Sequence, residues 1–508
     1  MKKFTLSPGF LSLKNIECIL DDKSTLQIKH ESYKNVQLSR NIVDNIINNN
    51  KIVYGINTGF GILAKEKISS SQVEDLQKRL IMSHAAGTGN FLDNKTVKLI
   101  LLLKINSLAQ GYSGISVDLL NYLIVFYNND IYPLIPEEGS VGASGDLAPL
   151  AHMSLAFMGI GNVKYKNRIL PVFEVLQKIG VKPYILKAKE GLAILNGTQV
   201  SLAIAIRGLI KVMRNFSLAT VTGSLSIDAT KSSIIPFNKE IACLKRSMGQ
   251  QIFSTIVRTL LRKSEIMNSH FLCKKVQDPY CIRCQPQVMG AILDKIFDSK
   301  LHLEAEINSV SDNPLIIFEN QSVISGGNFH AEGVAINSDI LGIISAEIGS
   351  ISERRIAMLM DRNMSGLPSF LVKNSGLNSG FMIPHVTAAS LVSENKVYAH
   401  PASVDTIPTS ANQEDHVSMA TVAARKMNKI ADNTLKIIAI EYLAASQGLD
   451  FHLPNITSPK LYEYYSKLRK KVSFYKEDRI FFNDINSSIK IMNDKTFYTE
   501  INQIIFNS

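Results

Sequence analysis

A short glycine-rich stretch carries the residues whose types and spacing could do unusual chemistry. Ala143, Ser144 and Gly145 lie in a loop with glycines at 139, 142 and 145, and Asp146 opens the apolar segment that follows. A glycine nitrogen has no side chain beside it, so in a compressed turn Gly145 N could attack the Ala143 carbonyl and close a five-membered ring. Loss of water from the ring and from the Ser144 hydroxyl would leave an alkene conjugated to an imidazolone. Such a group would be a stronger electrophile than any ordinary side chain.

Two simpler interpretations of the same stretch have to be weighed. One is a tight loop followed by a helix, with Asp146 as its N-cap and Pro149 tolerated in its first turn. The other is a phosphate-binding loop, which is disfavoured because no Gly-Lys-Ser/Thr follows and the dinucleotide spacing of glycines is absent. A helix starting at Asp146 would point its positive end at the oxygen of the ring.

Residues 142–150, Gly-Ala-Ser-Gly-Asp-Leu-Ala-Pro-Leu, resemble the prosthetic-group segment of the aromatic amino acid ammonia-lyase family. In that family the cyclisation forms 4-methylidene-imidazol-5-one. The resemblance therefore implies an Ala143–Gly145 cross-link with Ser144 as dehydroalanine, and neither an external cofactor nor a metal. Further matching segments follow in the same order along nearly the whole chain, at 54–61, 83–84, 196–199, 277–280, 283–287, 313–314, 327–330 and 412–416.

The resemblance also implies roles for single residues. Removing ammonia from an α-amino acid requires a base for the β-proton, and Tyr54 matches that base, while Tyr280 matches a second tyrosine near the prosthetic group. The sequence does not divide the proton transfers between the two. Arg283 would bind the substrate carboxylate through its planar two-donor fork.

Four more positions match residues around the substrate in the family. Asn196, Gln277 and Asn313 correspond to amides that hold the substrate or support the electrophile, and Phe329 corresponds to a residue packed beside it. Taken singly, each of these residue types is more often part of a turn or a core.

The positions expected to bind the substrate ring favour an imidazole. The pair Ser83-His84 is similar to family members that act on histidine, whereas relatives acting on tyrosine or phenylalanine commonly show His-Leu or Phe-Leu. Glu414 could accept a hydrogen bond from an imidazole N–H, and an amide is usual there in the tyrosine and phenylalanine enzymes. We therefore expect elimination of ammonia from L-histidine to trans-urocanate, the first step of histidine degradation.

Two alternatives remain open at this point. A tyrosine or phenylalanine ammonia-lyase, or an aminomutase, would use the same scaffold and electrophile on another substrate. A non-catalytic helical oligomer would keep only the scaffold. The resemblance further implies a homotetramer with a central helix bundle and sites built from several subunits, with which long amphipathic helices are compatible.

Metal chemistry is not expected. Cys281 and Cys284 form a Cys-x-x-Cys without a second pair at ligand spacing, so we interpret them as thiols near the active site. Four histidines show neither a His-x-x-x-His spacing nor a His-Glu pairing, which favours structural or second-layer roles: His330, His385, His400 and His416.

The apolar periodicity predicts a mainly α protein. Apolar residues recur three and four apart through six segments: Val73–Met82, Val97–Leu108, Leu192–Met213, Val288–Ile307, Val334–Met358 and Ala423–Leu443. Helix starts are expected at Ser70-Ser71, at Asp146 and at Asn412. We expect a glycine-rich part with smaller helices at residues 1–220, which carries the prosthetic-group loop, and a long-helix bundle at residues 221–508.

The composition of the chain limits the size of its core, its compartment and its partners. With 508 residues, of which 45% are apolar, the chain is long enough for a large core. Its five cysteines are an odd, sparse set, and no secretion signal or uninterrupted apolar span is visible, so we expect a cytoplasmic protein that does not enter membranes. The net charge of +11 comes from scattered lysines without a nucleic-acid-binding motif, and we expect no nucleic-acid partner.

Overall fold

The computed structural model describes residues 2–21, 24–49, 51–58, 72–269 and 276–506. These residues form 21 α-helices and nine short strands, so the expected mainly α class is confirmed. The chain divides into two compact units, which are described separately. Unit 1 comprises Met1–Arg207, Leu301–Asp339 and Pro401–Arg425, and unit 2 comprises Gly208–Lys300, Ile340–His400 and Lys426–Ser508. The expected division at residue 220, which assumes two continuous parts, stays a prediction.

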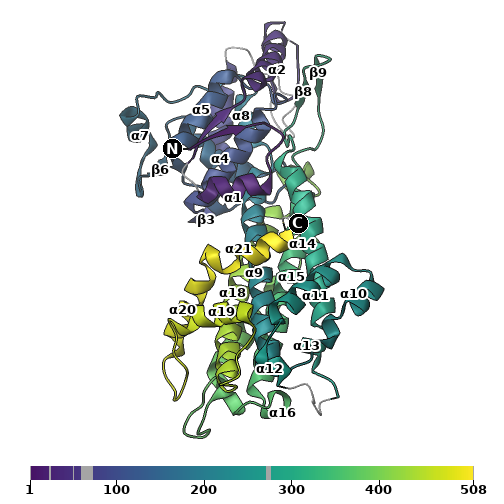
Figure 1. Cartoon of the computed structure of the whole chain (residues 1–508). Helices are drawn as coiled ribbons and strands as arrows, with labels where there is room; N and C mark the ends of the chain where they lie inside the picture. Colours follow the sequence, from purple (N-terminus) through teal and green to yellow (C-terminus); the bar gives the residue numbers. More distant parts are fainter. Residues whose placement is uncertain (1, 22–23, 50, 59–71, 270–275, 507–508) are drawn as a thin grey trace. The chain divides into compact units, whose positions relative to one another are not determined.

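Unit 1 is made of short and medium helices with small strand pairs between them (Figure 1). Its helices are α1 (Leu13–Asp21), α2 (His30–Asn48), α3 (Val73–His84), α4 (Asn94–Leu108), α5 (Val117–Asn128), α6 (Leu147–Phe157), α7 (Val172–Lys178) and α8 (Glu190–Leu195). Its strands are β1 (Lys2–Leu6), β2 (Ser24–Ile28), β3 (Thr88–Phe91), β4 (Tyr132–Pro133), β5 (Pro136–Glu138), β6 (Asn162–Tyr165), β7 (Arg168–Pro171), β8 (Leu315–Ile317) and β9 (Ser322–Ile324).

The strands of unit 1 form small separate sheets rather than one central sheet. β1 and β2 pair in parallel, with Lys2 opposite Ser24, and β3 pairs antiparallel with β5. β4, β6 and β7 form an antiparallel three-stranded sheet, and β8 and β9 form a hairpin. No sheet of the described residues exceeds three strands, so helix packing must supply the core.

Helix α4 is the centre of the core of unit 1. Every residue from Leu99 to Leu108 on this helix is buried, which is the pattern of a helix surrounded on all sides. Its start is fixed by Asp93, whose carboxylate accepts hydrogen bonds from Lys95 N and Thr96 N. One of its buried side chains is the cationic Lys104, only 1% exposed.

Unit 2 is built from long helices. Four of them contribute most of their length: α9 (Gln199–Ala229), α14 (Gln285–Ile307), α15 (Glu332–Met360) and α18 (Ala420–Asp450). The others are α10 (Lys239–Lys245), α11 (Met248–Leu261), α12 (Glu265–Asn268), α13 (Tyr280–Arg283), α16 (Arg362–Ser365), α17 (Met382–Tyr398), α19 (Pro459–Arg469), α20 (Phe481–Met492) and α21 (Lys495–Phe506).

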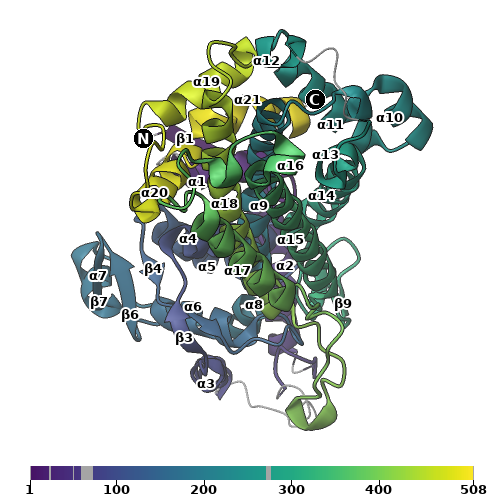
Figure 2. The ribbon, with the colours of Figure 1, turned by 90° about the horizontal axis from the view of Figure 1, so that it is seen from below.

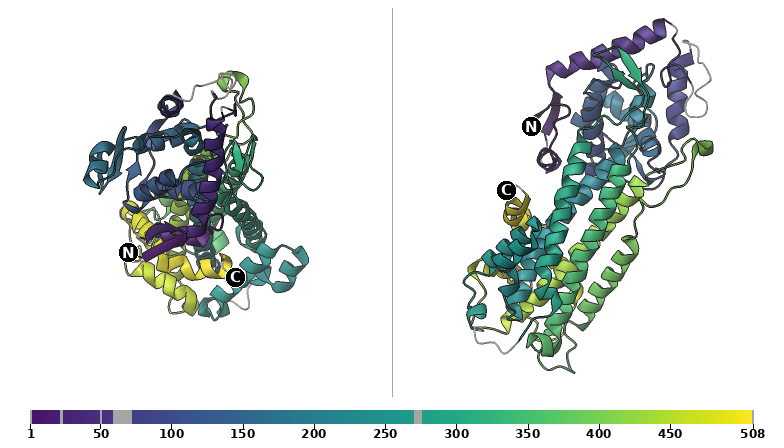
Figure 3. Two further views of the ribbon diagram at one scale, coloured as in Figure 1. Left: turned by 90° about the horizontal axis from the view of Figure 1, so that it is seen from above. Right: turned by 90° about the vertical axis from the view of Figure 1, so that its right-hand side faces the viewer.

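The long helices of unit 2 pack side by side, as Figures 2 and 3 show for α15, α17 and α18. On α18, Thr434 ties all three together, because its hydroxyl donates to Ser345 O on α15 and accepts from Asn395 Nδ2 on α17. Deeper in the unit, Arg355 forms a two-pronged ion pair with Glu441, and both side chains are fully buried. Such a pair adds little net stability, because burying both charges costs their hydration. Removing only one partner would be costly, because it would leave an unpaired buried charge.

Five of the six helical segments expected from periodicity are confirmed as single helices, namely α3, α4, α14, α15 and α18. The segment Leu192–Met213 was wrong as one helix, since α8 ends at Leu195 and α9 begins at Gln199. Asn196 is extended there (φ −71°, ψ 145°) and Gly197 has φ 120°, which only glycine adopts readily. The apolar repeat runs through the break, so periodicity alone could not find it.

One described helix, α15, is long and apolar enough to cross a membrane. Within the apolar 18-residue stretch of α15, 72% of the residues are buried inside the protein. Packing against neighbouring helices therefore accounts for the composition of α15.

Candidate active site

The loop predicted to carry the chemistry is compressed between glycines. Gly142 and Gly145 both have positive φ, 68° and 75°, and enclose Ala143 and Ser144. A Cβ on Gly145 would lie 2.3 Å from Gly197 O, so only glycine fits where this loop meets the break between α8 and α9. The Asp146 amide donates to the same Gly197 carbonyl at 2.8 Å, which locks the two segments together.

Asp146 has a different role from the expected one. It is the N-cap residue of α6, so the expected helix start is confirmed, but its side chain makes no capping hydrogen bond to that helix. Its buried carboxylate accepts instead from Val200 N and Ser201 N, the free amides at the start of α9, at 3.0 and 2.7 Å. The hydroxyls of Ser140 and Thr421 donate to its other oxygen. Burial raises the pKa of Asp146, and these donors oppose the rise.

An open cavity of about 1150 Å³ lies in unit 1 against this loop. Nine of the predicted site residues line it: Tyr54, Ser83, His84, Ala143, Ser144, Asn196, Asn313, Phe329 and Glu414. Gly145 is the third residue of the predicted ring and lies next to Ala143 and Ser144 in the loop. The structure therefore gathers most of the predicted set around Ser144.

One face of α3 forms a wall of the cavity. Leu76, Leu80 and Ser83 line it at the three- and four-residue spacing of a helix face, together with Arg79 and His84. Arg79 was not among the predicted site residues, although it lies on the predicted helix, one turn before Ser83. Extending the helical spacing back from Ser83 would have found it.

Hydrogen bonds favour one tautomer of His84. Its Nδ1 lies 2.8 Å from Leu80 O and 3.0 Å from Ser83 Oγ, and because a carbonyl only accepts, the contact with Leu80 favours a proton on Nδ1. Ser83 Oγ also donates to Leu80 O at 3.0 Å. In that tautomer Nε2 is the acceptor, a suitable partner for an N–H group in the cavity.

Glu414 is held by a strained turn. Three successive residues other than glycine, Ser410, Ala411 and Asn412, have positive φ of 51°, 55° and 67°. For a residue such as Ser410 or Ala411 this conformation costs about 1–2 kcal/mol, and asparagine tolerates it better. The turn is closed by Thr409 N donating to Glu414 O at 3.0 Å, and the expected helix start at Asn412 was wrong. Strain of this kind persists where the surroundings hold a side chain in one place.

The turn points the Glu414 carboxylate at the prosthetic-group loop. Its Oε2 accepts from Thr409 Oγ1 at 2.7 Å and from Ser410 Oγ at 2.9 Å. Its Oε1 accepts from Ser144 Oγ at 2.8 Å. The side chain that was expected to select the substrate is thus in direct contact with the side chain that was expected to react.

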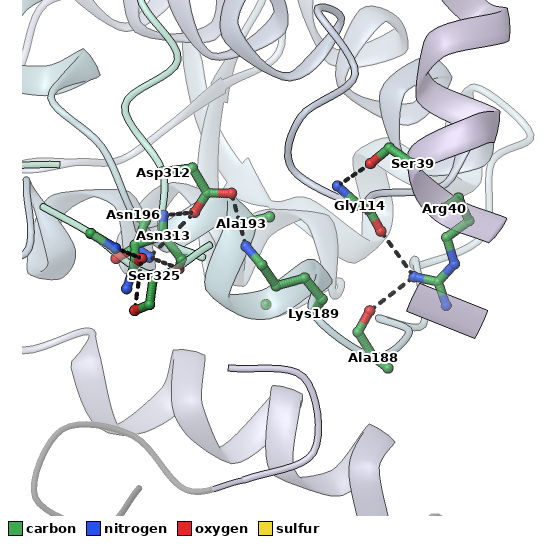
Figure 4. Close-up of polar contacts among 12 residues, drawn as sticks. Ser39, Arg40, Gly114, Ala188, Lys189, Ala193, Asn196, Asp312, Asn313 and Ser325 are labelled. Atoms are coloured by element: carbon green, nitrogen blue, oxygen red, sulfur yellow. Dashed lines mark hydrogen bonds and ion pairs between the residues drawn. The ribbon is translucent and has the colours of Figure 1, made fainter. Parts of the chain in front are cut away.

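Asn196 and Asn313 form one hydrogen-bonded unit at the cavity wall (Figure 4). Asn196 Nδ2 donates to Asn313 O at 2.8 Å and to Asp312 Oδ1 at 3.3 Å. Asn313 Oδ1 accepts from Ser325 Oγ and from Gly326 N. Both amides are therefore fixed before any substrate arrives.

Tyr54 is half-buried on the cavity wall and precedes a glycine that allows close packing. Gly55 has φ 72°, and a Cβ there would lie 2.7 Å from Leu192 and 2.8 Å from Pro314. The rest of the glycine-rich segment after Thr58, Gly59-Phe60-Gly61, lies outside the described residues.

Two histidines that were expected to be structural also line the cavity. The rings of His330 and His416 are parallel within 5°, with centroids 5.8 Å apart. His330 Nε2 donates to His416 O at 3.1 Å. Their spacing in the sequence did not indicate a place at the site, because only the fold brings these two histidines to the same cavity.

Gln277, Tyr280 and Arg283 belong to unit 2 and are not among the residues that line the cavity. The Arg283 guanidinium lies over the Tyr280 ring, 4.5 Å from its centroid. Within the described residues Arg283 Nε is buried without a hydrogen-bond partner, and Tyr280 is 69% exposed. This pair thus presents a cation and a phenol at the surface of unit 2.

The four cysteines that the structure describes are free thiols. Cys281 Sγ contacts Met358 Sδ at 3.8 Å, and burial raises the pKa of its thiol. The described residues contain no group of three or more His, Cys, Asp or Glu side chains arranged to hold a metal ion.

Comparisons with known proteins show the family to which this chain is similar. The family model described as aromatic amino acid lyase matches residues 11–470. A histidine ammonia-lyase of Legionella pneumophila is 50% identical, with 98% of each chain covered. The solved histidine ammonia-lyase of Trypanosoma cruzi superposes with a TM-score of 0.91 at 38% identity, covering 99% of this chain and 96% of that one. A tyrosine aminomutase of Streptomyces globisporus gives 0.92 at 31% identity, with 98% of each chain covered.

Proposed function

Because this chain belongs to the aromatic amino acid lyase family, we propose that the cavity of unit 1 is its active site. The chain eliminates ammonia from L-histidine and releases trans-urocanate, the first step of histidine degradation. The observation that supports the site best is the contact between Ser144 and Glu414 at the cavity wall, 2.8 Å long. It joins the reacting side chain and the side chain suited to an imidazole.

The loop fits the prosthetic group of the family, 4-methylidene-imidazol-5-one. Gly142 and Gly145 have left-handed backbone, and Gly145 approaches Gly197 so closely that no side chain is tolerated at the ring-forming nitrogen. Ala143, Ser144 and Gly145 would supply the ring. Once formed, the group offers a carbon electrophile to the substrate, which neutral side chains cannot do.

Glu414 and His84 are proposed to recognise the imidazole ring. Thr409 and Ser410 occupy Glu414 Oε2, while Oε1 is bonded to the Ser144 hydroxyl, which maturation removes. Oε1 then becomes free to accept one imidazole N–H. His84 Nε2 is a second acceptor, because Nδ1 lies against Leu80 O. A protonated substrate imidazole, with two N–H groups, would pair with both acceptors, and a neutral one would pair with one. An aromatic hydrocarbon ring would leave both acceptors unpaired, which penalises phenylalanine.

The proton and the carboxylate of the substrate need further groups. Tyr54 on the cavity wall is proposed to take the β-proton. Arg283, Tyr280 and Gln277 are proposed to come from a partner subunit of a homotetramer, with Arg283 binding the substrate carboxylate. Two observations support this proposal: Arg283 Nε is buried without a hydrogen-bond partner among the described residues, and Tyr280 is exposed.

We place the reaction in the cytoplasm. The free thiols of the described cysteines suit a reducing compartment, and the relative from Legionella pneumophila is bacterial. The substrate is a small molecule, and no nucleic-acid or membrane partner is proposed.

The test is a substrate panel. Purified protein is incubated separately with L-histidine, L-tyrosine and L-phenylalanine, and products are separated by chromatography. Urocanate from histidine, with little unsaturated acid from the other two, is expected. A β-amino acid or coumarate as main product would instead assign the site to an aminomutase or a tyrosine lyase. Absence of any product would refute the proposed site.

A further inference from the structure

A buried lysine lies directly behind the cavity and has no part in the roles assigned so far. Lys104 is on α4, surrounded by the leucines and isoleucines of the core of unit 1. A lysine in such a place loses its hydration, so it persists only where buried partners replace water. Its partners therefore indicate what it does.

The ammonium of Lys104 binds the carboxyl end of α8. Nζ donates to Ala193 O at 3.2 Å and forms a short hydrogen bond to Asn196 O. A cation suits this place, because the carbonyls at the end of a helix carry partial negative charge. The second of these carbonyls belongs to a residue of the cavity wall.

Asn196 is held from its other side by a second charged pair. Lys189 Nζ and Asp312 Oδ2 are 2.8 Å apart, with exposed fractions of 0% and 3%. The other oxygen of the Asp312 carboxylate, Oδ1, accepts hydrogen bonds from Asn196 Nδ2 and from Asn313 N. Figure 4 shows this chain from Lys189 through Asp312 to both asparagines. The chain just before the N-terminus of α8 is fixed as well, because Arg40 Nη1 donates a hydrogen bond to Ala188 O at 2.8 Å.

The bonding leaves one atom of Asn196 for the cavity. Both hydrogens of Nδ2 are used, one on Asp312 and one on Asn313, and the main-chain oxygen is bonded to Lys104. The remaining acceptor is Oδ1, which suits a substrate amine. Its direction is set by the two lysines and by Asp312.

We propose that Lys104 is a positioning residue for the lyase reaction, which fixes Asn196 at the cavity wall through its main-chain carbonyl. The inference rests on the proposed function. Burial lowers the pKa of Lys104 to about 7, with Lys189 acting in the same direction. Asp312 and Asp146 raise it, so these two buried carboxylates help to sustain the charge of Lys104.

The experiment compares two lysines of the same helix. Lys104→Met removes the bond to Asn196, while Lys98→Met removes a lysine of α4 that pairs with Asp130, 2.8 Å away, and touches no cavity residue. kcat and KM for L-histidine are measured, with intact mass to confirm that two waters have been lost. We expect Lys104→Met to lower kcat about 100-fold with KM changed less than about threefold. The reason is that a shift of about 1 Å in a residue that positions the reacting groups can cost about 100-fold in rate. Lys98→Met should keep kcat within about twofold.

Each other outcome has a defined meaning. Unchanged kcat in Lys104→Met, a loss confined to KM, an equal loss in Lys98→Met, or a Lys104→Met protein that keeps both waters would overturn the inference. Wild-type protein that makes no urocanate refutes the proposed function and this inference with it. If Lys104→Met does not fold, Lys104→Arg should keep kcat within about tenfold and Asp312→Asn should lower it by more. Equal activity of Asp312→Asn and wild type would then refute the inference.

Discussion

Replacing Glu414 by Gln changes one charge at the cavity wall and keeps the size of the side chain. The carboxylate accepts three hydroxyls at 2.7–2.9 Å, from Ser144, Thr409 and Ser410. Hydrogen bonds to a charged acceptor are worth about 1.5–3 kcal/mol, against about 1 kcal/mol for neutral pairs. A substrate N–H bound to Oε1 would therefore lose about 1.3 kcal/mol, the middle of the difference between the two ranges. At about 1.4 kcal/mol per factor of ten, kcat/KM for histidine should fall about tenfold.

The assay is the initial rate of urocanate formation over a range of histidine concentrations. Intact mass and thermal unfolding of Glu414→Gln show whether the protein is mature and folded. Asp415→Asn removes the neighbouring carboxylate of the same cavity as a comparison. A kcat/KM within about threefold of wild type would refute the role of Glu414. An equal loss in Asp415→Asn would show that the net charge of the cavity, rather than this acceptor, controls the rate.

Three further predictions concern the loop, the strained turn and a buried carboxylate. Gly145→Ala should keep both waters in its intact mass, because the new Cβ would lie 2.3 Å from Gly197 O; a mature, active variant would contradict the proposed ring geometry. Ala411→Gly should raise the free energy of unfolding by about 0.5–1 kcal/mol, since glycine adopts φ 55° without strain, and a lower melting temperature would show that the turn is unstrained. Burial raises the pKa of Glu353, but His385 and Arg354 at 2.6 and 2.5 Å outweigh it and bring the pKa down to about 2. The resulting stabilisation is present above the ordinary pKa of 4.5 and is lost as pH falls toward 2. Glu353→Gln should therefore lower the free energy of unfolding by about 2 kcal/mol at pH 7 and by little near pH 2, and a pH-independent difference in denaturant melts would refute this.

The long helices were predictable because their apolar repeat reports burial directly. Helices α14, α15 and α18 follow the repeat closely. The break at Asn196 and Gly197 was not predictable from the same signal, since the apolar spacing continues through it. What breaks the helix is the approach of Gly145 and Gly197, a contact between segments about fifty residues apart in the chain.

The candidate site was predictable in its residue types but not in its connections. The resemblance supplied nine residues that line the cavity, and helix spacing could have added Arg79. Capping rules placed Asp146 correctly before α6 but missed the partners of its carboxylate, because the amides it binds belong to α9 and reach it only in the folded chain. Propensities do not anticipate three left-handed residues before Glu414, since each is unfavourable alone.

The central claim is that Ala143, Ser144 and Gly145 mature into the electrophile that removes ammonia from histidine. Mass spectrometry of the peptide containing residues 143–145, taken from a preparation with measured histidine turnover, tests it most directly. We predict that this peptide lacks two waters in wild type, and that Ser144→Ala cannot form the alkene and loses nearly all turnover. An unmodified peptide in a fully active preparation would contradict the account.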